Sequence, residues 1–226
     1  MINNFLGLIG NTPLIRLDNL FKDCTFEVYA KLEIFNPGGS IKDRPAYNMI
    51  RLALDSGEIN SDTTIIESSS GNMGIGLAQI CSYLRLKFVC VVDSKTTKMN
   101  IDILKAYGAK VDIVNEPDPE TNDLLKARIK RVRSLLSNTS NSYQPNQYAN
   151  PNNPYAHHQT MHEIAMALDR KIDYIFVAVS TTGTMRGCAE YIKKNGLDTK
   201  IVAVDAFGSI LFDSTRGKRL IPGHGA

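Results

Sequence analysis

The stretch that decides the fold reads Asn36-Pro37-Gly38-Gly39-Ser40-Ile41-Lys42-Asp43-Arg44-Pro45. The apolar run 26–32 before it predicts a strand, and residues 46–54 after it predict a helix. Proline is tolerated in the first turn of a helix but not deeper, so Lys42 is expected at the helix entrance. The positive end of the helix dipole favours the neutral amine there. A neutral lysine amine suits Schiff-base chemistry, although a solvated lysine after a turn fits the same residues.

The whole chain has the composition of a globular protein. Of its 226 residues, 43% are hydrophobic and 22% are charged, with a formal net charge of +3. This charge is too small to indicate a nucleic-acid partner, and no apolar run reaches membrane-spanning length. The four cysteines are scattered, and three lie in apolar runs, so we expect buried free thiols rather than disulfides or zinc ligands. With no signal-peptide pattern at its start, the chain is expected to be cytoplasmic.

Strand-like and helix-like segments alternate after the lysine stretch. We expect strands at 63–66, 88–92, 110–114, 174–180 and 200–205, and helices at 73–84, 99–107, 123–136, 155–168 and 185–195. This order predicts an α/β fold of parallel sheets with helices on both faces. The polar stretch 137–153 is expected to be a domain junction or an active-site loop. The chain stops in a glycine-rich turn within 216–226, which leads us to expect an incomplete second domain.

The helix expected at 123–136 has an apolar face and a basic one. The apolar face is expected to contain Leu124, Leu125, Ile129, Val132, Leu135 and Leu136. Arg128 belongs to the opposite, basic face, where side chains are more often solvated. The pattern therefore predicts a surface helix.

Two hydroxyl-rich loops each follow a strand and open a helix. In residues 68–72, three serines precede Gly71 and Asn72, and the backbone N–H groups of such a loop favour a carboxylate. A serine-rich helix cap explains the same residues equally well. The second loop is Ser180-Thr181-Thr182-Gly183-Thr184, a pattern that holds a phosphate without a metal or a Walker lysine. Open α/β sheets bind ligands at such strand ends.

Several motifs together resemble the cysteine synthase and cystathionine β-synthase group. They are Gly10-Asn11-Thr12-Pro13-Leu14-Ile15-Arg16-Leu17, the lysine stretch, residues 67–74 and Gln147-Tyr148-Ala149-Asn150-Pro151. This resemblance implies a fold type II pyridoxal-phosphate (PLP) enzyme of the tryptophan synthase β type, with two open twisted sheets flanked by helices. It also implies a division into 1–42 as part of the large domain, 43–146 as the small domain and 147–226 as the partial domain that binds the cofactor phosphate. Such enzymes are homodimers when full length.

The resemblance also assigns roles. Lys42 would hold PLP covalently and later act as the base at the substrate α-carbon, and Asn72 would hydrogen-bond the ring oxygen of the cofactor. The cofactor phosphate would be bound by Ser180, Thr181, Thr182, Gly183 and Thr184. The substrate carboxylate would be held by Ser69, Ser70, Gly71 and Gln147.

Within the group, the motifs are most similar to the 2,3-diaminopropionate branch. Met73, where sulfide-using relatives usually have a hydroxyl, and the hydroxyl-rich loop 180–184 both agree with this branch. The implied reaction replaces the phosphate of O-phospho-L-serine by L-glutamate and gives N-(2-amino-2-carboxyethyl)-L-glutamate for siderophore or antibiotic precursors. Because a phosphate leaving group needs positive charge, Arg128 and Arg44 are candidates to bind it. Tyr148 is either a hydroxyl donor to the same group or a packing residue.

Three alternatives stay open at this stage. The first is a cysteine synthase that uses O-acetylserine and sulfide, and the second is a truncated, non-catalytic relative. The third is a metal site at His158 and His162, which are spaced i, i+4 but have no evident third ligand and no H-E-x-x-H pattern. We therefore expect no metal.

Overall fold

The computed structural model describes residues 4–212, 217, 221 and 223–225. The chain forms two compact units. Residues Met1–Pro45 and Pro151–Ala226 make one, which we call the terminal unit, and Ala46–Asn150 make the other, the central unit. The helix α1 (Asp43–Asp55) carries the chain from the first into the second.

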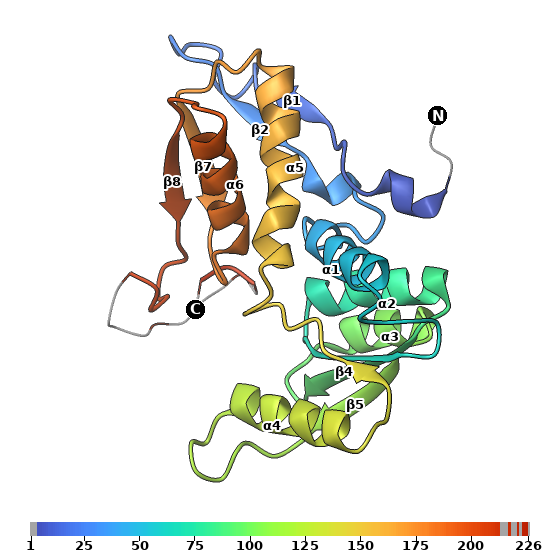
Figure 1. Cartoon of the computed structure of the whole chain (residues 1–226). Helices are drawn as coiled ribbons and strands as arrows, with labels where there is room; N and C mark the ends of the chain where they lie inside the picture. Colours follow the sequence, from blue (N-terminus) through green and yellow to red (C-terminus); the bar gives the residue numbers. More distant parts are fainter. Residues whose placement is uncertain (1–3, 213–216, 218–220, 222, 226) are drawn as a thin grey trace. The chain divides into compact units, whose positions relative to one another are not determined.

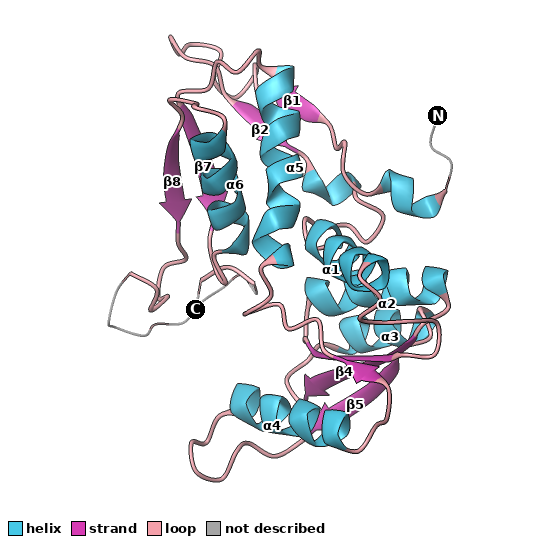
Figure 2. Ribbon diagram, viewed as in Figure 1, coloured by secondary structure: helices cyan, strands magenta, loops and turns pink. Residues whose placement is uncertain are grey.

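The central unit is built on a parallel sheet of four strands in the order β5-β4-β3-β6. Its elements after α1 are β3 (Thr64–Ser68), α2 (Asn72–Leu84), β4 (Lys87–Asp93), α3 (Lys98–Ala106), β5 (Lys110–Val114), α4 (Leu124–Ser137) and β6 (Ser142–Tyr143). The helices α2 and α3 cover one face of the sheet and α4 covers the other (Figure 2). Since β3 and β4 are covered on both faces, they are almost continuously buried.

One part of the core of this unit lies between the sheet and α4. Ile66 of β3, Val91 of β4 and Val132 of α4 are each at most 1% exposed and pack together. Fully burying side chains of this size contributes roughly 1.5–3 kcal/mol each to stability. The carboxyl ends of β3 and β4 therefore have fixed positions, and the loop 69–71 begins from one of them.

The terminal unit contains two small sheets and two long helices. Its elements are a 3-10 helix η1 (Phe5–Leu8), β1 (Leu14–Arg16), β2 (Tyr29–Lys31), a 3-10 helix η2 (Glu33–Phe35), α5 (Asn152–Ala167), β7 (Tyr174–Ala178), α6 (Gly183–Lys194) and β8 (Lys200–Val204). The strands β1 and β2 pair antiparallel, whereas β7 and β8 pair parallel around the crossover helix α6 (Figure 1). The core of this unit combines Met161 of α5 with Cys188 and Ile192 of α6.

The two helices of the terminal unit approach closely because of one glycine. A Cβ at Gly187 of α6 would lie 2.0 Å from the backbone oxygen of Pro154 and 2.8 Å from Cβ of His157, both in α5. Only a residue without a side chain fits there. This contact places the first turn of α6 directly against the first half of α5.

The alternation of strands and helices confirms the α/β prediction, and each expected element after residue 43 lies within a few residues of its predicted place. The strands β1 and β6 were not predicted, because segments of three and two residues have too little periodicity to recognise. Within 137–153, β6 pairs with β3 and α5 begins at Asn152, so this polar stretch is partly ordered structure. Met73, which stands where sulfide-using relatives usually have a hydroxyl residue, is 3% exposed and belongs to the core.

The apolar face predicted for α4 was partly wrong. Leu125 is 37% exposed, and Arg128, which was expected in solvent, is 8% exposed. Arg128 lies one helical turn before the buried Val132 and therefore shares its face.

Cys81, Cys90 and Cys188 are buried free thiols, as predicted, and Cys24 is an exposed one. In the part of the chain that the structure describes, no helix has both the length and the hydropathy of a membrane span.

Candidate active site

Lys42 stands immediately before α1, behind a tight turn. Gly39 adopts a φ of +76°, a conformation that glycine accepts without strain. The carboxylate of Asp43, which is fully buried, accepts a hydrogen bond from the N–H of Gly38 at 2.5 Å, and Ser40 Oγ accepts one from the N–H of Lys42 at 3.2 Å. Burial lowers the pKa of Lys42. The turn thus presents a half-buried amine whose neutral form is favoured.

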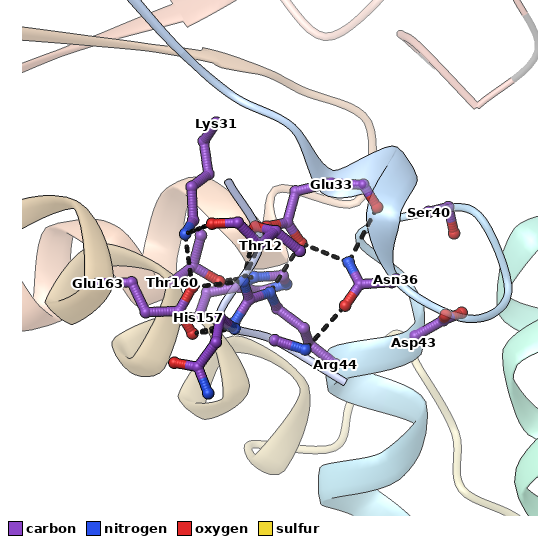
Figure 3. Close-up of polar contacts among 12 residues, drawn as sticks. Thr12, Lys31, Glu33, Asn36, Ser40, Asp43, Arg44, His157, Thr160 and Glu163 are labelled. Carbon is purple, nitrogen blue, oxygen red and sulfur yellow. Dashed lines mark hydrogen bonds and ion pairs between the residues drawn. The ribbon is translucent and has the colours of Figure 1, made fainter. Parts of the chain in front are cut away.

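The lysine stretch is held by a buried ion cluster around Arg44 (Figure 3). Its guanidinium donates to Glu33 at 2.7 and 2.8 Å and to Glu163 at 2.8 and 2.8 Å. Lys31 Nζ lies 2.6 Å from Glu163 and also donates to the backbone oxygen of Thr12 at 2.6 Å. The cluster therefore joins the segment near residue 12, the strand β2, the start of α1 and the helix α5.

The electrostatics of this cluster favour the charged forms of its members. Burial opposes ionisation of Glu163, but its hydrogen bonds from Arg44 and Lys31 outweigh burial and lower its pKa to about 2. Burial alone would lower the pKa of Arg44, but its hydrogen bonds to Glu163 and Glu33 raise it. Because the Arg44 guanidinium is 3% exposed and already bonded to both, our suggestion that Arg44 binds a substrate phosphate was wrong. Its role is to fix the backbone two residues after Lys42.

The Gly10-Asn11-Thr12 segment packs against this ion cluster and hydrogen-bonds to it. Gly10 has a φ of +86°, and a Cβ there would come within 2.9 Å of an Arg44 nitrogen. The N–H of Gly10 donates to Asn36 Oδ1 at 2.8 Å, and the N–H of Asn11 donates to Glu163 at 2.9 Å. Two motifs that are far apart in the sequence are thus parts of one structural arrangement.

The loop 180–184 joins β7 to α6, as predicted. Thr182 precedes α6 with a left-handed φ of +61°, and a Cβ on the buried Gly183 would come within 3.1 Å of Asn153 Oδ1. The first N–H groups of an α-helix have no partner within the helix, and together with the dipole they attract an anion. Ser180 Oγ donates to the backbone oxygen of Gly225 at 2.8 Å, and the N–H of Gly225 donates to Val179 at 2.7 Å.

The two hydrogen bonds of Gly225, with Ser180 and Val179, fix the position of part of the C-terminal turn. Its described residues, 223–225, lie against the end of β7, whereas Pro222 and Ala226 of the same turn lie outside the described residues.

A buried histidine links the lysine to this loop. His157 of α5 is completely buried, and its Nε2 lies 3.3 Å from Oγ1 of Thr184. Its pKa is lowered to about 3, first by burial and then by the positive charges of Lys42, Arg44 and His158. Lys42, whose amine is the predicted cofactor ligand, thus contributes electrostatically to the pKa of this imidazole. The terminal unit therefore brings Lys42 and Thr184 into one neighbourhood.

The central unit contains the predicted carboxylate loop. Ser69 Oγ accepts hydrogen bonds from the N–H groups of Gly74 at 2.9 Å and Gly71 at 3.4 Å, so it shapes the loop as a cap of α2. The backbone oxygen of Ser70 accepts a bond from Asn100 at 2.8 Å. Asn72, at the start of α2, is exposed. The helix-cap interpretation is thus correct for the Ser69 hydroxyl, while Ser70 and Gly71 remain half-exposed.

Gln147 lies beside this loop because of Glu67. The buried Glu67 carboxylate accepts bonds from the N–H of Ser68 at 2.7 Å and of Gln147 at 3.2 Å. The Gln147 side chain donates to the backbone oxygen of Ser68 at 3.4 Å. Burial raises the pKa of Glu67 despite these donors. The predicted carboxylate ligands from 69–71 and 147 therefore come together around one buried acid.

Arg128 has unused hydrogen-bonding capacity. Its Nε forms an ion pair with Asp93 Oδ2 at 3.2 Å, and its buried Nε and Nη1 have no hydrogen-bond partner among the described residues. The positive charge of Arg128 also acts on the phenol of Tyr148. The pKa of Tyr148 is raised, mainly by partial burial, with Arg128 lowering it and Glu67 raising it; the side chain as a whole is 57% exposed. Arg128 and Glu67 therefore both influence the Tyr148 phenol within this unit.

Sequence reasoning did not identify Glu33, Glu163, Glu67 or His157. Each is a buried polar group whose partners lie far away in the chain, as Arg44 and Glu163 do at a separation of 119 residues. The one available signal was an ionisable residue within an otherwise apolar segment, as for Glu67 after the run Ile65-Ile66.

The two histidines considered for a metal have other contacts. His158 lies 3.2 Å from Glu190, and His162 lies 3.0 Å from the hydroxyl of Tyr191. The described residues hold no group of three or more His, Cys, Asp or Glu side chains arranged for a metal ion.

Comparisons with known proteins agree with this geometry. The chain is 45% identical over 224 residues to N-(2-amino-2-carboxyethyl)-L-glutamate synthase of Ralstonia nicotianae (strain ATCC BAA-1114 / GMI1000), which covers 99% of the chain and 66% of that protein. The chain thus spans about two thirds of this curated relative.

Two solved structures are similar over the whole chain. A hydrogen sulfide-producing enzyme from Fusobacterium nucleatum matches with a TM-score of 0.90 and 36% identity, and the match covers 72% of it. An O-acetylserine dependent cystathionine beta-synthase from Helicobacter pylori matches with a TM-score of 0.88 and 34% identity, over 73% of its length. The pyridoxal-phosphate dependent enzyme family matches residues 5–224. The chain therefore belongs to the family of pyridoxal-phosphate dependent enzymes.

Proposed function

We propose that the chain is the core of a PLP-dependent synthase that replaces the β-substituent of an O-activated serine. The observation that supports this most directly is the neighbourhood of His157. There the amine of Lys42, whose pKa is lowered by burial, and the hydroxyl of Thr184 lie near the same buried imidazole. An amine and an anion-binding loop placed together are what an aldehyde bearing a phosphate requires.

The residues present fit the cofactor. Burial lowers the pKa of the Lys42 amine and so shifts it toward its neutral, nucleophilic form. The loop 180–184 supplies hydroxyls and the N-terminus of a 12-residue helix, and the absence of a Cβ at Gly183 lets the Asn153 side chain approach that terminus closely. PLP, when bound, supplies an electron sink for bond changes at the substrate α-carbon.

The side chains of this chain would divide the remaining work. Lys42 would hold the cofactor covalently and afterwards move the proton of the α-carbon through its neutral Nζ. Thr181, Thr182, Gly183 and Thr184 would bind the phosphate, with Ser180 fixing the loop through Gly225. In the central unit, Asn72 would donate to the ring oxygen, and Ser69, Ser70, Gly71 and Gln147 would hold the substrate carboxylate.

We propose O-phospho-L-serine as the donor and L-glutamate as the acceptor. Arg128 supports this choice, because its buried Nε is paired only with Asp93 and its Nη1 has no hydrogen-bond partner among the described residues, so the guanidinium could still donate to a doubly charged phosphate. Tyr148 lies within its electrostatic reach and would donate its phenol to the same group. The Ralstonia relative is named for the product of this pair of substrates.

A cysteine synthase reaction with O-acetylserine and sulfide is the second candidate. The observation in its favour is the similarity to structures that are named for sulfide production and for O-acetylserine dependence. An acetate leaving group has less charge to neutralise, so this reaction would leave the orphaned nitrogens of Arg128 unexplained.

The first experiment tests cofactor binding. Purified chain is mixed with PLP, reduced with borohydride and digested, and the modified lysine is located by mass spectrometry. We expect the label at Lys42 and its loss in Lys42→Ala, with Lys31→Ala as a control lysine from the ion cluster. A wild-type chain that stays colourless and unlabelled would contradict the proposal for this chain and favour a non-catalytic relative.

The second experiment identifies the substrates. The chain is incubated with each donor, O-phosphoserine or O-acetylserine, and with glutamate or sulfide, and the products are identified by mass spectrometry. We expect the adduct of glutamate from O-phosphoserine. Thiol product without any glutamate adduct would replace our choice by the cysteine synthase reaction.

We also propose that the central unit corresponds to the small domain, near 43–146, and the terminal unit to parts of the large domain, 1–42 and 147–226. Assembly as a homodimer and a cytoplasmic location belong to the same proposal. Light scattering of the purified protein at several concentrations measures the first of these.

A further inference from the structure

His157 has hydrogen-bonding partners on both sides of its ring. Its Nε2 lies 3.3 Å from Thr184 Oγ1, and its Nδ1 lies 3.3 Å from Thr160 Oγ1. The ring is completely buried between α5 and the start of α6, where Gly187 allows the two helices to touch. This residue of α5 therefore contacts the predicted phosphate loop directly.

The protonation state of this ring follows from its surroundings. Burial and the nearby positive charges of Lys42, Arg44 and His158 lower the pKa of His157 to about 3. At neutral pH the ring is therefore uncharged, with one nitrogen that donates and one that accepts. The ring can therefore set the direction of one hydrogen bond at an anion site, but it adds no positive charge there.

The direction of that bond decides what Thr184 has to offer. A threonine hydroxyl has a single proton and can accept two hydrogen bonds. If Nε2 accepted from Thr184, that proton would be used within the protein. If Nε2 carries the hydrogen and donates, the Thr184 proton is free for an outside oxygen. The hydroxyl of Thr160 selects the second arrangement when it donates to Nδ1, because the hydrogen of the ring then sits on Nε2.

We propose that His157 is a positioning residue: its Nε2–H donates to Thr184 Oγ1 and so turns the hydroxyl proton of Thr184 toward the phosphate held by the loop 180–184. The chain of bonds runs from the Thr160 hydroxyl to the imidazole and then to the Thr184 hydroxyl. Hydrogen bonds in such a chain strengthen one another in a buried setting. This inference rests on the proposed function, because the outside oxygen is the cofactor phosphate.

The first test reads the tautomer directly, in the cofactor-free chain. Long-range proton–nitrogen NMR identifies which ring nitrogen of His157 carries the hydrogen, and the spectrum of His157→Gln assigns the signals. We expect the Nε2–H form, with no titration between about pH 5 and 8. A ring with its hydrogen on Nδ1 would overturn the inference.

A second variant tests the contribution of Thr160 without disturbing the packing. Thr160→Val keeps the shape of the side chain but removes its donor. We expect a signal of the Nδ1–H tautomer to appear beside that of Nε2–H. PLP affinity should fall about threefold, because the molecules with the hydrogen on Nδ1 no longer orient the Thr184 hydroxyl. An unchanged tautomer in this variant would remove Thr160 from the proposed chain of bonds and contradict it.

The last test is a double-mutant cycle on PLP affinity, measured by equilibrium dialysis with the full chain. We expect His157→Phe and Thr184→Val each to weaken binding about tenfold, the effect of losing one charge-assisted hydrogen bond. Because both changes remove the same bond to the phosphate, the double variant should bind no more weakly than Thr184→Val alone. His157→Gln, whose amide still offers a donor, should recover much of the affinity, and His158→Gln on the same helix is the control.

The outcomes separate this inference from the proposed function. If Thr184→Val binds PLP as the wild type does, the phosphate loop itself is misassigned and both proposals fall. If Thr184→Val weakens binding while His157→Phe does not, or if the two effects multiply, the role of His157 is refuted and the proposed function stands. A wild-type chain that binds no PLP refutes both. Thermal unfolding of every variant shows whether a loss of affinity reflects a loss of folded protein.

Discussion

At the scale of single residues, the guanidinium of Arg128 is the group that we propose selects the donor. The residue is 8% exposed, its Nε is paired with Asp93 at 3.2 Å, and neither Nε nor Nη1 has a hydrogen-bond partner among the described residues. Leaving a buried donor unsatisfied costs about 1–3 kcal/mol. A ligand that satisfies these nitrogens would recover that cost on binding, and a phosphate does so better than a neutral ester.

We therefore predict a selective effect of Arg128→Met. The apparent dissociation constant of O-phosphoserine, followed through the cofactor absorbance, should rise about 10- to 100-fold, whereas that of O-acetylserine should change little. The control is Arg131→Met, because Arg131 lies on the same helix in an exposed pair with Asp112 at 2.8 Å. Equal weakening of both donors, or the same change in the control, would show that Arg128 does not recognise the phosphate.

At the scale of elements, the ion cluster holds α5 to the lysine stretch, and its strength depends on pH. The pKa of Glu163 is about 2 in the folded protein, below its ordinary value of 4.5. A lowered carboxyl pKa stabilises the fold above the unfolded value, and this contribution disappears as the pH falls from about 4.5 toward 2. For this group it amounts to up to about 3 kcal/mol.

Glu163→Gln tests this stabilisation. In urea unfolding near neutral pH the variant should lose about 3–5 kcal/mol, because Arg44 keeps its charge in a buried site with one carboxylate removed. Its stability should also fall less steeply than that of the wild type between about pH 5 and 3. Glu190→Gln, which removes an exposed acid from α6, should change little. Parallel pH profiles for wild type and Glu163→Gln would contradict this account.

The contact between α5 and α6 gives a second prediction at this scale. Gly187→Ala should destabilise the protein by about 1–3 kcal/mol or more, although alanine favours helices, because its Cβ would lie 2.0 Å from the Pro154 oxygen. The exposed Ala189→Gly in the same helix should cost about 1 kcal/mol by propensity alone. Thermal unfolding measures both. A stabilised Gly187→Ala would show that the helices are not in contact at this point.

At the scale of the whole molecule, the terminal unit exposes apolar side chains of its parallel sheet. Tyr174 and Phe176 of β7 are 53% and 69% exposed, and Phe207, soon after β8, is 96% exposed. Tyr174 and Phe176 alternate with the inward-facing Ile175 and Val177, so they share the outer face of the strand. Apolar patches of this kind promote association between molecules.

We predict that Phe176→Lys reduces self-association of the 226-residue chain without loss of fold. The substitution places a charge on an outward-facing position of a strand and leaves the inner face intact. Light scattering should show a smaller weight-average mass than for the wild type, with an unchanged far-UV circular dichroism spectrum. Met99→Lys, at a position 68% exposed on α3, is the control and should have no such effect. A wild-type chain that is monomeric at all concentrations would contradict the prediction.

The sequence by itself determined the alternation of strands and helices, the buried thiols and the family. These features are local, since a periodic apolar pattern or an uninterrupted motif such as the lysine stretch keeps its meaning wherever the chain goes. The strands β1 and β6 could not be predicted from the sequence, because segments of three and two residues are too short to show a periodic apolar pattern.

Only the tertiary structure decided the environment of each charge. Arg44 and Arg128 are both arginines in helices, yet one donates hydrogen bonds to Glu33 and Glu163, while the other has an ion pair with Asp93 and two nitrogens without a hydrogen-bond partner among the described residues. His157 is neutral because folding removes water from its ring and brings Lys42 and Arg44 near it. Burial and long-range pairing set the charge and direction of each polar group, and neither quantity is contained in a local stretch of sequence.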